Sequence, residues 1–230
     1  MKKIILLALL AIGVAPAYAQ TSVGVIGGYN LSSITPKFYD YDITSRSGWR
    51  AGLIADRHLW SKFYLQPQLI LNKKGYNYAF YNPESDISGK AKRQLLYLEL
   101  QANMLFKQQL RGGKLFAGAG AYLGRGIDGS EKEENRYQIN GSPVKSTTHY
   151  VVKYRNEEPE YNPGSGANNI RYVKPYDVGL NFVAGYELKN GLFFNATYSI
   201  GVNSLGYWGG WNSRNTYWGL SIGYFLKKFS

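Results

Sequence analysis

Two histidines are the residues of this chain best suited to catalysis, and their surroundings differ. His58 follows Asp56 by two positions, so both side chains would share one face of a strand, but no nucleophile is placed near them. His149 follows a hydroxyl-bearing run, residues 146–148, within a long polar segment. A hydrolase or acyltransferase site needs a histidine, a carboxylate and a hydroxyl that converge, and any long polar loop supplies all three types. We therefore predict that the protein is not an enzyme.

The residue inventory also argues against metal and cofactor chemistry. The chain has no cysteine, and two widely separated histidines do not make an ordinary zinc site. The acidic residues of the polar segment lack the alternating spacing of a calcium-binding loop. We predict no catalytic residue, no metal ligand and no cofactor.

The clearest structural pattern lies in residues 95–106, whose sequence is LLYLELQANMLF. One parity is apolar, from Leu96 to Phe106, and the other carries Tyr97, Glu99, Gln101 and Asn103. A period of two indicates a β-strand with one apolar and one polar face. The length of the stretch and its polar face favour lipid outside and a polar lumen inside.

Eight segments alternate in this way, at about 23–31, 48–58, 63–78, 95–106, 114–125, 176–188, 192–202 and 217–226. The connections are short at 59–62, 108–113 and 189–191, and long at 31–47, 79–92, 127–175 and 203–216. Short and long connections therefore alternate, which is typical of periplasmic turns and extracellular loops. We predict an all-β fold, an eight-stranded antiparallel up-and-down transmembrane β-barrel.

The first residues predict export. Lys2 and Lys3 precede a short apolar run, residues 4–14, and Ala17-Tyr18-Ala19 forms a cleavage site. The apolar run is far shorter than the roughly 20 residues of a membrane-spanning helix. We therefore assign residues 1–19 to a signal peptide and residues 20–230 to the barrel, located in the bacterial outer membrane.

The composition is strongly basic. Removal of Lys2 and Lys3 lowers the formal net charge from +12 to +10. Export and the absence of a nucleic-acid-binding motif exclude nucleic acid as a partner, so we expect an anionic lipid surface, including lipopolysaccharide. The 21 tyrosines suit aromatic girdles at the membrane interfaces.

The longest connection, residues 127–175, holds seven acidic and seven basic residues. Asn140-Gly141 lies between two alternating runs, which predicts a hairpin with a type I′ turn. We expect this loop to be extracellular and mobile.

Four segments resemble the PorT-like family of outer-membrane barrels, namely residues 25–32 (VIGGYNLS), 64–75 (YLQPQLILNKKG), 97–101 (YLELQ) and 116–124 (FAGAGAYLG). Gln101 and Ala121 stand where the family usually has proline. The C-terminal residues, 225–230, lack the terminal aromatic residue typical of outer-membrane barrels. The resemblance implies an eight-stranded barrel, and the family's namesake acts in protein secretion to the cell surface.

The inward parity of the strands predicts a polar lumen cluster of Arg50, Gln68, Glu99, Gln101 and Asn181. Side chains fill the interior of an eight-stranded barrel, so this cluster suggests a plug more than a channel. A buried carboxylate needs a partner, and Arg50 is the inward basic residue assigned to the depth of Glu99. We therefore predict an Arg50–Glu99 ion pair.

Two further sets of residues are candidates for binding at the loop end of the barrel. Possible contacts to lipid phosphates are the basic residues that flank the second long loop, namely Lys73, Lys74, Lys90, Lys92 and Arg93. The alternative is a solvated basic rim. A possible aromatic surface for sugars or a partner protein comprises Tyr207, Trp208 and Trp211, and the alternative is an aromatic girdle.

Together these features predict a non-enzymatic outer-membrane barrel with a structural or surface-interaction role. The alternative is a component of a secretion or outer-membrane assembly machine, with protein partners in the cell envelope. A small channel and a loop-borne hydrolase or acyltransferase rank below both.

Overall fold

The computed structural model describes residues 21–35, 41–82, 87–139, 142–157, 169–207 and 213–229. The predicted signal peptide, residues 1–19, lies outside these residues, as does the predicted turn at residues 140–141. The described residues contain no helix that is long and apolar enough to cross a membrane.

All described elements are β-strands. In chain order they are β1 (Thr21–Thr35), β2 (Asp42–Trp60), β3 (Phe63–Asn82), β4 (Ile87–Leu110), β5 (Gly113–Ile139), β6 (Ser142–Tyr154), β7 (Ile170–Val173), β8 (Tyr176–Leu188), β9 (Leu192–Gly201) and β10 (Arg214–Phe229).

The strands close into a ring. Pairing runs in the order β4-β3-β2-β1-β10-β9-β8-β5, and β5 pairs in turn with β4. Every pair in the ring is antiparallel, as the sequence predicted. Each of these eight strands pairs with a neighbour on both sides, so the ring encloses an interior.

The described residues hold ten strands, whereas the sequence predicted eight barrel strands and a hairpin within the longest loop. The two additional strands, β6 and β7, lie in the segment assigned to the long loop, residues 127–175. Beyond Arg125, β5 leaves β8 and continues as a hairpin with β6, with Ser130–Ile139 pairing with Ser142–Val151. The short β7 then pairs with β6 in parallel. The predicted hairpin around residues 140–141 is thus confirmed by the pairing of its two strands, and β7 is the strand that the sequence did not predict.

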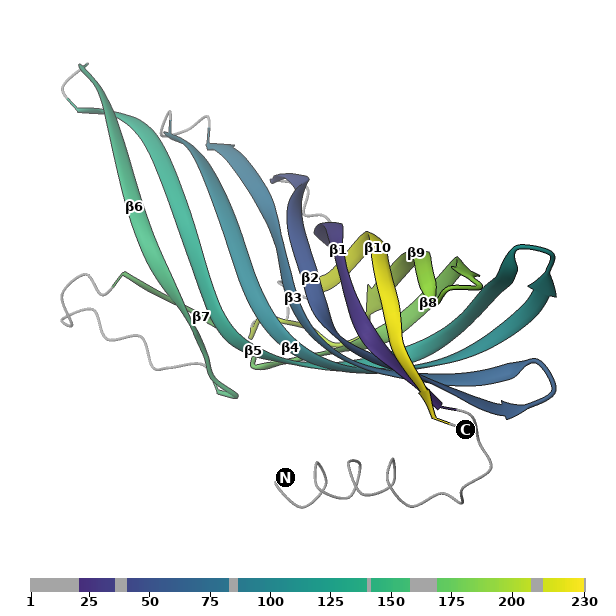
Figure 1. The fold of residues 1–230 in the computed structure, drawn as a ribbon. Helices are drawn as coiled ribbons and strands as arrows, with labels where there is room; N and C mark the ends of the chain where they lie inside the picture. The colour runs from purple at the N-terminus through teal and green to yellow at the C-terminus, as the bar shows by residue number, and fades with distance from the viewer. Residues whose placement is uncertain are drawn as a thin grey trace.

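The ring is much taller on one side than on the other (Figure 1). β4 and β5 have 24 and 27 residues, whereas β8 and β9 have 13 and 10. The upper parts of β3, β4 and β5, together with β6, form a sheet that projects past the ring, and we call it the wall. It comprises residues 75–82, 87–94, 130–139 and 142–154. Much of the predicted loop 79–92 is therefore strand.

Burial alternates along the ring strands. In β4, the side chains of Tyr97, Glu99, Gln101 and Asn103 are buried, and the apolar residues between them are exposed on the outside. This apolar exterior and polar interior match the predicted faces. Short turns join the strands at one end, where Gly191 adopts a φ of 92° that suits glycine.

Inward glycines make room in this narrow interior, as the sequence suggested. A Cβ atom at Gly120 would collide with the carbonyl oxygen of Ala102 and with the side chain of Asn103. Gly118 is equally close to the backbone of Met104. Larger residues at these positions would separate β4 from β5.

Candidate functional site: the polar interior and the wall

The interior nearest the short turns is built around Lys107 of β4. Its Nζ lies 2.8 Å from Oδ2 of Asp56 and 2.8 Å from Oε2 of Glu187, and the Lys107 side chain is almost fully buried. The amide of Gln66 donates to Asp56 at 3.3 Å. One cation therefore joins carboxylates from β2 and β8 across the ring.

The middle of the interior is occupied by Arg50. Its guanidinium donates to Oε1 of Gln101 at 3.2 Å, to Oγ1 of Thr197 at 3.3 Å and to Oε1 of Gln68 at 3.5 Å. Gln68 in turn donates to Gln66 at 3.0 Å. The neutral amides thus connect Arg50 to the Lys107 group.

The predicted Arg50–Glu99 ion pair is wrong. Gln101 lies between the two residues, accepting from Arg50 and donating to Oε2 of Glu99 at 2.7 Å. The cation that pairs with Glu99 is Lys74, whose Nζ lies 2.7 Å from Oε1. The prediction failed because it treated Arg50 as the one inward cation at that depth.

Lys74 occupies the centre of the interior at the end away from the turns. It also contacts Oδ2 of Asp177 at 2.9 Å, and all three side chains are fully buried. Tyr122 and Asn215 donate to Asp177 at 3.0 and 2.7 Å. The sequence-based assignment of Lys74 to lipid phosphates is therefore wrong, because the side chain points into the ring.

These contacts form one continuous chain of polar side chains through the interior, which we call the lumen chain. It runs through Glu187, Lys107, Asp56, Gln66, Gln68, Arg50, Gln101, Glu99, Lys74 and Asp177. Asn181, predicted to join this cluster, instead accepts from Ser199 at 2.8 Å. Buried charges that are paired and hydrogen-bonded in this way fix a packed interior.

A second charged cluster lies on the inner face of the wall. Arg93 pairs with Glu131, whose side chain is fully buried, and the Tyr78 hydroxyl donates to Glu131 at 3.1 Å. Arg171 of β7 contacts Glu133 at 2.8 Å and Glu131 at 3.5 Å. Arg93 therefore faces a carboxylate, and its assignment to lipid phosphates is wrong as well.

The surroundings of this cluster shift the ionisation of its members. Burial raises the pKa of the Tyr78 hydroxyl, and the Glu131 carboxylate raises it further. Burial alone would lower the pKa of Arg93, but Tyr76 and Glu131 outweigh burial and raise it. Both residues keep their protons at neutral pH, so the cluster acts as fixed donors around Glu131.

The remaining basic candidates lie on the outer face of β3 and β4. Lys90 and Lys92 are exposed and Lys73 is partly exposed. Of the five predicted lipid contacts, the structure therefore leaves three on the outside.

Two of the three aromatic candidates, Trp208 and Trp211, lie outside the described residues. Tyr207 is described, and its hydroxyl donates to the carbonyl of Arg155 at 2.7 Å. Its ring lies near the ammonium group of Lys174, at 5.9 Å from Nζ to the ring centroid. Tyr207 therefore ties the last loop to the β6–β7 segment.

The histidines are not brought together. The ring of His58 lies 3.0 Å from the carbonyl of Ser61 in a short turn and packs on Tyr64. His149 lies on β6, opposite Lys132. Among the described residues there is no cluster of three or more potential metal ligands.

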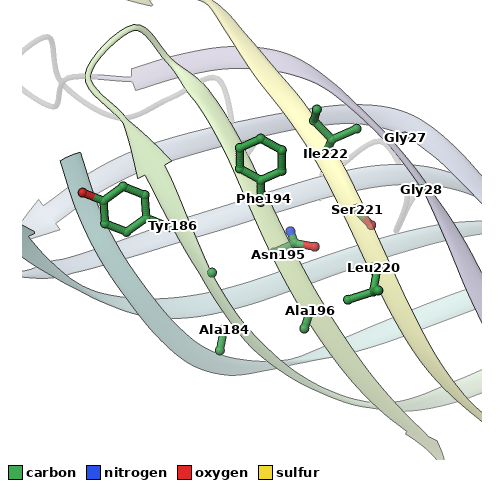
Figure 2. A pocket seen from close by; sticks show the side chains of 11 residues that line it. Gly27, Gly28, Ala184, Tyr186, Phe194, Asn195, Ala196, Leu220, Ser221 and Ile222 are labelled. Carbon is green, nitrogen blue, oxygen red and sulfur yellow. The ribbon is translucent and has the colours of Figure 1, made fainter. Parts of the chain in front are cut away.

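A shallow apolar hollow of about 570 Å³ lies on the outside of β8, β9, β10 and β1 (Figure 2). The small residues Gly27, Ala184 and Ala196 line it, together with larger apolar residues such as Phe194 and Leu220. The lining is mostly apolar, and Asn195 and Ser221 are the buried polar residues in it.

The sequence profile of the family described as "Outer membrane protein beta-barrel domain" matches residues 18–206. The chain belongs to this family. Membership implies an outer-membrane location and agrees with the ring of antiparallel strands.

More distant similarities come from solved structures. Ail of Yersinia pestis, solved in complex with the heparin analogue sucrose octasulfate, is 15% identical with a TM-score of 0.38, covering 90% of this chain and 97% of that chain. Neisserial surface protein A, NspA, is 11% identical with a TM-score of 0.36, covering 90% and 99%. No curated protein sequence matches the chain.

The sequence analysis did not place two buried lysines of the interior, Lys74 and Lys107. Lys74 shares the parity of Gln68, and Lys107 shares the parity of Glu99, so continuing each inward row would have placed both inside. Lys74 was instead grouped with its neighbour Lys73 as a basic patch. The strand period was the available signal.

Proposed function

We propose that the protein is a non-enzymatic, PorT-like outer-membrane barrel in which eight strands, β1–β5 and β8–β10, span the membrane and the wall carries a surface-interaction role. The wall itself is the observation that supports this role. A transmembrane β-strand needs only about 9–11 residues, whereas β4 and β5 have 24 and 27. The excess length extends a charged, ordered sheet past the apolar part of the ring.

The lumen chain favours a structural barrel over a channel. The side chains of Lys74, Glu99 and Asp177 are fully buried and bonded to one another. Opening a water path would require these pairs to separate, which is costly in a packed interior. We expect no stepwise single-channel conductance from the purified protein in a planar bilayer.

The orientation of the wall can be tested with single cysteines, because the chain has none of its own. Thr147→Cys places a thiol on β6 of the wall, and Lys189→Cys places one in a short turn. On intact cells, a membrane-impermeant maleimide should label the first variant and not the second. The reverse pattern would show that the wall faces the periplasm.

One observation favours the second candidate, a component of a secretion or assembly machine. β7 pairs with β6 only at Val151–Tyr154, so within the described residues the outer edge of β6 from Ser142 to Tyr150 pairs with no strand. An unpaired edge can accept a strand from a partner protein. Pro143 and Lys145 near the tip would limit such pairing to the residues closer to the ring.

Purification of the intact protein from its native membrane separates the two candidates. A secretion complex that co-purifies with the protein, and is lost when residues 136–148 are deleted, would favour the second. If the intact protein and the deletion variant both purify without partners, the first candidate is favoured.

A further inference from the structure

The outer face of the wall carries a row of cations just past the apolar exterior. By strand register, Lys92 lies directly between Asn77 of β3 and Lys132 of β5 on this face. Lys90 lies two residues further along β4, and Lys73 lies on the same side of β3, opposite Leu96. We call Lys73, Lys90, Lys92 and Lys132 the basic face.

The basic face has more lysines than carboxylates: Glu134, which lies opposite Lys90 in the register of β4 and β5, is the acidic residue beside it. In the part of the chain that the structure describes, neither Lys73, Lys90 nor Lys92 forms an ion pair, and Lys132 shares Glu134 with Lys145. Lys92 and Lys132 are direct cross-strand neighbours, an arrangement of like charges that is unfavourable by itself. An anion between them would relieve the repulsion.

On the inner face of the same strands, at the same distance from the ring, the arginines are paired with carboxylates. There, Arg93 pairs with Glu131, and Arg171 pairs with Glu133. The wall therefore separates its charges, with arginine–carboxylate pairs inside and an excess of lysines over carboxylates outside, where Glu134 pairs with Lys132 and Lys145. Basic composition alone does not account for this separation.

The position of the basic face indicates the kind of anion. Lys73 follows Leu71 by two residues on the same face, and Leu69, Leu71, Leu98 and Leu100 are exposed on the outside below it. In a membrane, this apolar belt would contact acyl chains, so the lysines would begin at the depth of the headgroups. Lysine stems can lie along apolar surface while the ammonium group reaches a phosphate.

We propose that the basic face binds the phosphate groups of a phosphorylated outer-leaflet lipid, of which lipid A is the relevant class. The inference rests on the proposed function, since it requires that the ring spans the outer membrane with the wall outward. Direct continuity between the apolar belt and the lysines favours a membrane lipid over a soluble polyanion, which would need no adjoining apolar surface.

The test compares two triple variants with equal charge changes. Lys73→Gln, Lys90→Gln and Lys92→Gln together remove three charges from the basic face. Lys62→Gln, Arg111→Gln and Lys189→Gln remove three from the short turns. The full-length proteins are purified in detergent, and the affinity for bisphosphorylated lipid A and for dephosphorylated lipid A is measured by native mass spectrometry.

We expect the basic-face variant to bind bisphosphorylated lipid A about 100-fold more weakly than the unmodified protein, from the typical contribution of a lysine near an anionic headgroup. The turn variant should bind as the unmodified protein does. Dephosphorylated lipid A should bind all three proteins equally and weakly. Thermal unfolding of each protein in the same detergent verifies that the variants are folded.

Three results would overturn the proposal. Equal losses in the two variants would indicate a general charge effect, and unchanged binding in the basic-face variant would show that the lysines do not contact the lipid. If inorganic polyphosphate competes with bound lipid A as strongly as free lipid A does at equal phosphate concentration, this result would assign the basic face to a soluble polyanion. Failure of the proposed membrane location is recognised separately, because the protein would then not insert into lipid vesicles.

Discussion

Lys73 and Lys74 are adjacent in β3 and lie in opposite electrostatic surroundings. Lys74 is fully buried inside the ring between Glu99 and Asp177, whereas Lys73 is on the outside and forms no ion pair with the described residues. Lys92 and Arg93 repeat this contrast in the wall. In a strand, a shift of one residue exchanges the interior for the exterior, so clustering in sequence does not imply a shared role.

The largest expected effect separates the two lysines directly. Lys74→Met should lower the free energy of unfolding by about 3–5 kcal/mol, because it leaves two buried carboxylates without their cation. Lys73→Met should change it by less than about 0.5 kcal/mol, as is usual for an exposed site. Urea titration of the protein refolded into lipid vesicles measures both values, and similar losses would contradict the contrast.

Double-mutant cycles sharpen the assignment of partners within the lumen chain. Lys74→Met and Glu99→Gln should be coupled by about 1–3 kcal/mol, because the two groups are in direct contact. Arg50→Met and Glu99→Gln should be coupled by less than about 1 kcal/mol, since Gln101 lies between them. A larger coupling energy for Arg50 and Glu99, measured by the same titrations, would support a direct ion pair between them.

In the wall, the contrast between the paired Arg93 and the exposed Lys92 should appear as a local change in stability, while the ring stays folded. Arg93→Gln removes the more buried of the two arginines that contact Glu131, so we expect hydrogen-exchange protection in β5 and β6 to fall by about 2 kcal/mol. Lys92→Gln should leave this protection unchanged within about 0.5 kcal/mol. Exchange measured by mass spectrometry on peptides of residues 130–154 tests the pair. Equal protection in both variants would mean that the inner cluster does not order the wall.

The smallest effect concerns the outer face of the hairpin. Hydrogen bonding and charge from Lys132, with Lys145, lower the pKa of the Glu134 carboxyl to about 2. A carboxyl group whose pKa is lowered in the folded state stabilises that state at pH values above its ordinary pKa of 4.5. This contribution is lost as the pH falls toward 2. Exchange protection at the tip should therefore be constant from pH 7 to 5 and fall slightly below pH 4. Glu134→Gln should remove this dependence, and a dependence that persists in the variant would assign it to another group.

Local alternation in the sequence was enough to predict much of the fold. The apolar outward row of residues 96–106 and the polar row from Tyr97 to Asn103 lie as predicted, in antiparallel strands that close a ring. The same rule placed Arg50, Gln68, Glu99 and Gln101 in the interior correctly. It failed at residues 79–92, where the strands continue with polar residues beyond the apolar belt and the sequence predicted a loop.

Only the tertiary structure decided which interior groups meet. Lys74 and Asp177 are 103 residues apart in the sequence, and their contact depends on the registers of the strand pairs between β3 and β8 around the ring. Period two determines the face of a side chain and is silent on its partner across the interior, because that partner depends on the combined stagger of the strands. The sequence by itself therefore determined inside and outside, and ring closure decided that Glu99 pairs with Lys74 and not with Arg50.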